Sequence, residues 1–352
     1  LEDANLRENN IVELPSELFT APVAVTEKIN LRLNPISVRS FQDLDEYRRR
    51  TGVGMGLQED DVPMLSELRS RQAWLEGETA DAYLGRLAKW HLLKDDWRSG
   101  DFFAVLRQMV NTPQYKQVRH DLVRRVWHVI DAAIENSELR ELLFNLAKGE
   151  PNCVDAAAYS FSEMEVTVML DKAMKEAGVT KPSVAILLKL GRGLFRLEQV
   201  DSLSDVFSRR KNIADQLAVR LVYRSGLAKT LDLPGQPESI TYRDVGGVSQ
   251  EDLTEAIAQV TTREMSSDLS RFLARQGFWL EYLKHQFAAE FTNVSRVYDT
   301  QYNALDLAST TYLEQTLKLQ ADHQQARDQL VERLTRTALE DADKPLTLQC
   351  PL

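Results

Sequence analysis

The chain has 352 residues, with 43 Lys and Arg against 53 Asp and Glu, which gives a formal net charge of −10. This length allows two domains, or one extended helical body with a small appendage, and the negative charge argues against nucleic-acid binding through a general electrostatic footprint. No run of about 18 apolar residues occurs and the first residues lack signal-like basic and apolar regions, so we expect no membrane span and no secretory leader.

The first 40 residues contain two segments with the pattern of leucine-rich repeats. Residues 6–15 read L-R-E-N-N-I-V-E-L-P, and residues 31–36 read L-R-L-N-P-I. Asn9 and Asn34 are separated by about 25 residues, within the usual repeat period, and each is expected to bond backbone groups at a turn. We predict that residues 1–40 are the C-terminal end of a leucine-rich-repeat region, the truncated end of a longer solenoid. A chance coil rich in Leu and Asn is the alternative.

After this region we predict mainly helix, because Gly and Pro are few and apolar residues recur at three- and four-residue spacing. Thr112 and Pro113 have the order of an N-cap and a first helical residue. The apolar stripe that follows comprises Tyr115, Val118, Leu122, Val126, Val129 and Ala133. The next helix is predicted over 137–147, where Gly149 and Pro151 end it.

Further elements are predicted by the same criteria. We expect helices over 183–198, 200–210, 214–231 and 249–265, long helices between 279 and 339, and a short extended segment at 239–245. Ser162 and Glu165 have the spacing of a capping box, and so do Ser249 and Asp252.

The Pro- and Gly-containing stretch at 234–247 has the composition of a hinge between two lobes. We therefore predict a larger lobe at 41–240 and a helical C-terminal lobe at 241–352. The expected fold is mainly α, a multi-helix two-lobed domain preceded by a remnant of a leucine-rich-repeat solenoid.

Cys153 and Asp155 lie together at a predicted break between helices. The only other cysteine, Cys350, is distant, so no disulfide framework is expected, and the five histidines have no metal-ligand spacing with either cysteine, so we predict no metal. In extended backbone the two side chains would project to the same face, roughly 7 Å apart. If Asn152 is instead an N-cap, Asp155 is the third helical residue, and the helix dipole favours both the thiolate and the carboxylate.

A cysteine attacks as its thiolate, which a positive neighbour favours and a carboxylate does not. Asp155 is therefore expected to act later, by accepting a proton from an incoming amine. The structural alternative is a small buried thiol beside a solvated or helix-capping carboxylate.

Four arginines are candidates for electropositive support of the thiolate: Arg192 and Arg196, with Arg124 and Arg125. Arginines on helices more often face solvent or pair with Glu, so they rank below the cysteine and its carboxylate. His120 and His128 lie on a predicted helix and are expected to belong to its packed or solvated faces.

Several motifs occur in a characteristic order along the chain. They are Arg125-Val126-Trp127, Glu138-Leu139-Arg140, Cys153-Val154-Asp155, Leu190 to Glu198, Val219 to Tyr223, and Gly246-Gly247-Val248-Ser249 followed by Asp252-Leu253. With these motifs and the preceding repeats, the chain resembles the NEL (novel E3 ligase) domain of bacterial leucine-rich-repeat effectors, the IpaH and SspH type of ubiquitin ligase.

The resemblance implies a cysteine-dependent E3 ubiquitin-protein ligase. Cys153 matches the nucleophile that takes ubiquitin from a charged ubiquitin-conjugating enzyme (E2) as a thioester. Asp155 matches the family carboxylate, the general base for a lysine of a host protein recruited by the repeats. The resemblance further implies a bacterial effector secreted into the host cytoplasm, with no cofactor.

Two other functions remain open at this point. One is a catalytically inactive helical interaction scaffold, against which the retention of Cys153 and Asp155 argues. The other is a cysteine hydrolase or acyltransferase, which is disfavoured because no histidine is placed by the sequence to act as its base.

Two positions depart from the pattern that the resemblance implies, an Arg directly after Cys-x-Asp and a Glu in a later D-E-x-E-V run. Here they are Ala156 and Ala218. Because deleting one partner of an ion pair leaves an uncompensated charge, the loss of both suggests that these positions form a pair elsewhere in the family.

We therefore expect Ala156→Arg alone to lower ligase activity and Ala156→Arg with Ala218→Glu to restore it, because the double change rebuilds both partners. Rates of ubiquitin transfer by the single and double variants measure this coupling. Additive damage in the double variant would contradict the pairing.

Overall fold

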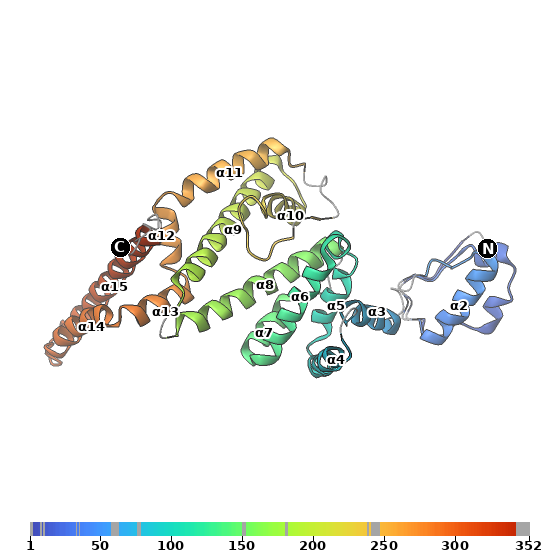
Figure 1. Cartoon of the computed structure of the whole chain (residues 1–352), viewed down its shortest axis with the longest axis horizontal. Coiled ribbons are helices and arrows are strands. Elements are labelled where there is room, and N and C mark those ends of the chain that lie inside the picture. The colour runs from blue at the N-terminus through green and yellow to red at the C-terminus, as the bar shows by residue number, and fades with distance from the viewer. Residues whose placement is uncertain are drawn as a thin grey trace, which may run out of the picture. The chain divides into compact units, whose positions relative to one another are not determined.

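The computed structural model describes residues 3–7, 9, 11–32, 34, 36–57, 63–75, 79–149, 153–179, 182–237, 239–240 and 247–342. The chain divides into two compact units, Leu1–Asn111 and Thr112–Leu352. Both are mainly helical, which confirms the predicted fold class (Figure 1). The division coincides with neither predicted boundary, and the assignment of lobes to 41–240 and 241–352 stays a prediction.

The N-terminal unit begins with two short parallel strands, β1 (Ala4–Asn5) and β2 (Ile29–Asn30). Ala4 pairs with Ile29 and Asn5 with Asn30, so the strands are related by the spacing predicted for one repeat. Between them lie a short 3-10 helix, η1 (Ser16–Phe19), and α1 (Val23–Thr26).

The side chain of Asn34 connects the two repeat-like segments. Its carbonyl oxygen accepts the backbone N–H groups of Asn9 at 2.9 Å and Ile11 at 3.0 Å. Its amide donates to the carbonyl oxygens of Leu6 at 2.7 Å and Leu31 at 2.8 Å. These bonds use the full capacity of the amide, and the residue is 1% exposed. The backbone-bonding role predicted for Asn34 is therefore present, while the assignment to a leucine-rich-repeat region stays a prediction.

Four longer helices follow in this unit: α2 (Val38–Thr51), α3 (Pro63–Leu75), α4 (Ala80–Lys94) and α5 (Gly100–Met109). The hydroxyl of Ser37 caps α2 by accepting the N–H of Ser40, and Gly52, with φ of 80°, ends it. Phe41, Leu44 and Tyr47 of α2 pack with Leu31 and Ile36 of the repeat-like region.

The C-terminal unit contains α6 (Pro113–Glu135), α7 (Ser137–Leu146), α8 (Val154–Ala177), α9 (Val184–Lys211), α10 (Gln216–Leu227), α11 (Gln250–Glu264), α12 (Ser267–Leu273), α13 (Gly277–Gln286), α14 (Ala288–Asn303) and α15 (Tyr312–Ala342). Helices α6 and α7 pack against α8, while α10 and α11 pack along α9. Helices α14 and α15 form a pair at the end of the unit (Figure 1).

Two hydrophobic cores hold this unit together. The first joins α9, α10 and α11 through residues that include Val200, Phe207, Val219 and Val260. The second joins the end of α8 and the start of α9 to α12, α13 and α15 through residues that include Ala177, Leu187, Phe272, Trp279 and Leu334. Each core contains residues from before and after position 240, the predicted boundary between the lobes.

The predicted helix starts are confirmed where a side chain caps the backbone. Thr112 accepts the N–H of Tyr115 at 3.1 Å, and Ser249 with Asp252 forms a complete capping box at the start of α11. The predicted apolar stripe on α6 is buried from Leu122 onward, but Val118 is 46% exposed. The helix is kinked at Val118, whose φ and ψ are −133° and 41°, and this turns the side chain out of the stripe.

Two other local predictions are wrong, and a third is largely untested. Ser162 begins no helix, because it lies inside α8, where its buried hydroxyl donates to the carbonyl oxygen of Tyr159. The segments 183–198 and 200–210 form one helix, α9. The extended segment predicted at 239–245 lies largely outside the described residues, and no strand is assigned to residues 239 and 240, which are described.

A close helix approach occurs at Gly191 in α9. A Cβ added there would lie 2.4 Å from Cδ2 of Leu273, a residue of α12 that is 0% exposed. Gly85 in α4 has no atom within 4 Å of the same position.

We therefore expect Gly191→Ala to lower the free energy of unfolding of the C-terminal unit by about 1–3 kcal/mol through overpacking. Gly85→Ala should be neutral or stabilise α4 by up to about 1 kcal/mol, because alanine is the better helix former. Amide hydrogen exchange in α9 and α4 measures the two effects separately. Equal protection in both variants would show that Leu273 can move aside.

Candidate active site

Cys153 is itself the N-cap of α8. Its backbone is extended, with φ of −152° and ψ of 165°, and its sulfur accepts the N–H of Ala156 at 3.3 Å. The carbonyl oxygen of Cys153 accepts the N–H of Ala157 at 3.2 Å, the first turn of the helix. The alternative in which Asn152 is the N-cap is therefore wrong, because the thiol of Cys153 caps the helix and α8 begins at Val154.

Asp155 is the second residue of α8 and is 4% exposed. It lies in the first helical turn, where the helix dipole stabilises a carboxylate. The expectation that Cys153 and Asp155 share one face in extended backbone is also wrong. Only Cys153 is extended, and in the helix that follows, residues two apart lie on different sides.

Glu165 lies further along α8 and is buried against Arg125 of α6. Arg125 donates through Nε to Oε1 of Glu165 at 2.6 Å, through a second nitrogen to Oε2, and to the carbonyl oxygen of Gly235 at 3.3 Å. Burial raises the pKa of Glu165 above its usual value, although the hydrogen bond and charge of Arg125 oppose this shift. Arg125, a candidate for support of the thiolate, therefore binds this carboxylate.

Arg224 of α10 is a buried cation, with 3% of its side chain exposed. It binds both carboxylate oxygens of Asp201 in α9, at 2.7 and 2.5 Å, and Oε1 of Glu163 in α8 at 2.5 Å. It also donates to Oε1 of Gln236 at 3.4 Å. Burial by itself lowers the pKa of Arg224, but the hydrogen bonds and charges of Asp201 and Glu163 raise it above its usual value.

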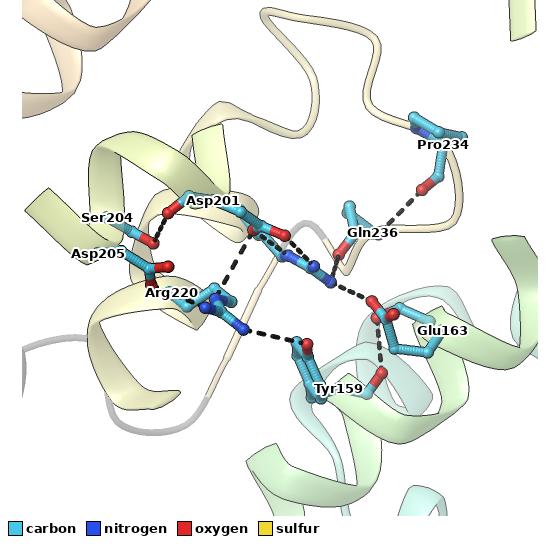
Figure 2. A network of polar contacts seen from close by, with 10 residues as sticks. Tyr159, Glu163, Asp201, Ser204, Asp205, Arg220, Pro234 and Gln236 are labelled. Carbon is cyan, nitrogen blue, oxygen red and sulfur yellow. Dashed lines mark hydrogen bonds and ion pairs between the residues drawn. The ribbon is translucent and has the colours of Figure 1, made fainter. Parts of the chain in front are cut away.

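Arg220, one turn before Arg224, makes a second link between the same helices (Figure 2). It donates to Oδ1 of Asp205 at 2.7 Å and to the hydroxyl of Tyr159 at 3.4 Å. The ring of Tyr159 also lies 4.7 Å from the guanidinium carbon of Arg224. Sequence reasoning missed this network. The signal available was the four-residue spacing of Asp201 with Asp205 and of Arg220 with Arg224.

Arg192 and Arg196, the leading candidates for electropositive support, both bind Glu264 of α11. Arg196 contacts its two carboxylate oxygens at 2.6 and 2.8 Å, and Arg192 contacts Oε1 at 3.3 Å. Burial alone would raise the pKa of Glu264, but the hydrogen bonds and charges of the two arginines lower it below its usual value. The three residues line a pocket of about 700 Å³ to which Cys153 does not contribute.

The remaining candidates lie on exposed surface. His120 and His128 are exposed on α6, and Arg124, with 77% of its side chain exposed, pairs with Asp121 at 2.5 Å. Cys350 lies outside the described residues. Within the described ranges, no group of His, Cys, Asp and Glu could hold a metal ion. No helix in the same part of the chain is long and apolar enough to cross a membrane.

Ala156 and Ala218 occupy equivalent places in their helices. Each is the third residue of its helix and donates its N–H to the capping side chain, the sulfur of Cys153 for Ala156 and Oδ1 of Asp215 for Ala218. The ion pair inferred for these positions elsewhere in the family stays a prediction.

The site lies within a part of the chain that matches a known protein family. The family described as "C-terminal novel E3 ligase, LRR-interacting", or NEL, matches residues 74–290, more than half of the chain. The chain belongs to the NEL family. The match includes the N-cap of α8 and the helices that carry the arginine and carboxylate network, so the resemblance seen in the sequence motifs is confirmed.

Curated relatives of this NEL chain are bacterial proteins. E3 ubiquitin-protein ligase SlrP of Salmonella typhimurium is 23% identical over 321 residues, covering 85% of this chain and 41% of SlrP. SspH2 of the same species is 26% identical over 251 residues, covering 68% and 31%. E3 ubiquitin-protein ligase ipaH3 of Shigella flexneri is 24% identical over 286 residues, covering 79% and 48%. The chain spans less than half the length of each of these relatives.

The lowered pKa of Glu264 predicts how stability depends on pH. A carboxyl group whose pKa is lower in the folded state stabilises the fold at neutral pH, and this contribution is lost as the pH falls below about 4.3 toward the folded-state pKa. Glu264→Gln should therefore lower the free energy of unfolding by about 1–3 kcal/mol at pH 7, and by progressively less below pH 4.

Urea unfolding from pH 7 to pH 3 measures this difference. Glu332→Gln is the matched control, because Glu332 pairs with Arg336 on exposed surface, where an ion pair contributes little. A penalty for Glu264→Gln that does not change with pH would show that the carboxylate charge is not what stabilises the site.

Proposed function

We propose that this chain is the ligase part of a bacterial effector E3 ubiquitin-protein ligase that forms a thioester on Cys153. The observation that carries the proposal is the sulfur of Cys153 at the N-cap of α8, with Asp155 in the first turn, in a chain of the NEL family. Its relatives SlrP and ipaH3 bear the name E3 ubiquitin-protein ligase.

In the first half-reaction the thiolate of Cys153 attacks the carbonyl carbon of the ubiquitin thioester on an E2. The bond to ubiquitin forms on Cys153, and the thiolate of the E2 departs. The N–H of Ala156 and the helix N-terminus support negative charge on the attacking sulfur. Because one thioester replaces another, this step needs no proton acceptor.

In the second half-reaction a lysine amine attacks the thioester, ubiquitin passes to the lysine, and the sulfur of Cys153 is released. The attacking group must lose a proton, and its ordinary pKa of about 10.4 leaves little free amine at neutral pH. Asp155 is the proposed acceptor of that proton. Its burial strengthens its attraction for the lysine ammonium.

The partners of this proposed activity are ubiquitin, an E2 and a host protein. The repeat-like region at residues 1–40 is the proposed end of the segment that recruits the host protein. The Salmonella and Shigella relatives support action in the cytoplasm of a host cell after secretion by a bacterium.

The proposal predicts a ubiquitin adduct that reductant removes. Mixing the protein with a charged E2 should give this adduct in the wild type and none in Cys153→Ala. Cys153→Ser should give an adduct that resists reductant, because an oxyester replaces the thioester. A folded wild type without an adduct would contradict the proposal and favour a helical interaction scaffold.

The role of Asp155 is tested by its conservative variant. Asp155→Asn should accumulate the thioester adduct and lose transfer to lysine by about 10²-fold or more, the usual scale of general-base catalysis. Glu138→Gln is the matched control, because Glu138 is the second residue of α7 and carries the same helix-dipole interaction. Similar activity in the two variants would reduce Asp155 to a helix-stabilising charge.

A further inference from the structure

Three helices of the C-terminal unit each contribute two polar side chains, four residues apart, to one network. The pairs are Tyr159 and Glu163 from α8, Asp201 and Asp205 from α9, and Arg220 and Arg224 from α10 (Figure 2). Residues four apart lie on one face of a helix, so three helix faces meet here. The arginines of α10 bridge the carboxylates of α9 to the side chains of α8.

Tyr159 is held in this network at both its ring and its hydroxyl. The guanidinium carbon of Arg224 lies 4.7 Å from the ring centroid, a cation–π distance. Nη1 of Arg220 donates to the hydroxyl at 3.4 Å. The ring also packs against the buried side chains of Leu221, Val222 and Ile240. Two cations and an apolar cluster therefore fix one rotamer of Tyr159.

Tyr159 is also the neighbour of Asp155 on the surface of α8. The two residues are four apart, and a long side chain on a helix leans over the turn toward the N-terminus. Helix geometry therefore places Tyr159 on the side of the first turn that carries Asp155, which is 4% exposed. The sulfur of Cys153 is held differently, by the backbone N–H of Ala156.

We propose that Tyr159 is a positioning residue for the transfer of ubiquitin to lysine, acting through Asp155. The network of Arg220 and Arg224 fixes Tyr159, and Tyr159 fixes the side of the first turn of α8 that carries the carboxylate. This inference rests on the proposed ligase function and deepens it, because it gives the two half-reactions different structural supports.

The consequence is a separation between loading and transfer. Loading depends on the sulfur of Cys153 and the N–H of Ala156, and none of the hydrogen bonds or ion pairs that form the network involves either group. Transfer depends on where the carboxylate of Asp155 lies relative to the lysine ammonium. A displacement of about 1 Å at such a group can cost 10²-fold in rate.

The test uses the whole chain in single turnover. Cys153 is loaded from a charged E2, further charging is stopped, and free lysine is added as the acceptor amine, with Cys153→Ala measuring transfer from the E2 itself. Tyr159→Leu should load within about twofold of the wild type and transfer about 10- to 100-fold more slowly at pH 7. Tyr159→Phe keeps the ring against Arg224, so its transfer rate should fall less than that of Tyr159→Leu.

The pH dependence of transfer distinguishes positioning from damage to the fold. With Asp155 misplaced, only lysine that is already deprotonated attacks, so the transfer rate of Tyr159→Leu should rise steeply, by up to tenfold per pH unit, between pH 7 and pH 9. The transfer rate of the wild type should rise less over the same pH range. The defect of Tyr159→Leu should thus shrink at high pH and resemble that of Asp155→Asn.

Tyr282→Leu is the control for lost aromatic packing, because Tyr282 lies against Trp279 at 4.9 Å in α13, within the other core. It should lower loading and transfer together, in proportion to any loss of folded protein. Tyr159→Leu behaving in the same way, or changing neither step, would overturn the positioning role while leaving the ligase proposal intact. Failure of the wild type to load would overturn the ligase proposal and this inference with it.

Discussion

The guanidinium of Arg224 is a charge held where only 3% of its side chain meets solvent. Removing a cation from water is costly, and the cost is offset only when several well-placed acceptors surround it. Those acceptors come from three separate places, Asp201 in α9, Glu163 in α8 and Gln236 in the segment after α10. The arrangement of these elements is therefore constrained by one side chain. A shift of any one of these elements would remove a hydrogen-bond acceptor from the buried guanidinium of Arg224.

The same principle recurs on the opposite flank of α8. Arg125 of α6 binds buried Glu165 and also the carbonyl oxygen of Gly235, next to the residue that Arg224 binds. Two arginines from different helices thus fix two neighbouring residues of one connecting segment against α8. Gly235 has φ of 68°, and a Cβ there would lie 3.3 Å from the carbonyl oxygen of Ser162, so glycine suits this close crossing. The helix that Cys153 caps is consequently held from both sides.

Sequence reasoning succeeded where the determinant is local. The caps at Thr112 and Ser249 depend on residues three apart, and both are present. It failed at Cys153, because sulfur is not among the usual capping atoms and Asn152 was the capping residue considered there. It also failed to find the partner of Arg196. Helical spacing gives the face on which an arginine lies, but which carboxylate it meets, here Glu264, depends on how distant helices pack. The network at Tyr159 combines three helices, and the sequence alone could not predict it for the same reason.

The capping sulfur of Cys153 has a further consequence for the proposed cycle. A thiolate is a good acceptor for the N–H of Ala156, whereas the sulfur of a thioester carries no negative charge and accepts poorly. Loading with ubiquitin would then loosen the start of α8, and departure of the thiolate as leaving group would restore the cap. The helix N-terminus would thereby favour the empty enzyme over the loaded one, and the regained hydrogen bond would help to drive each turnover to completion.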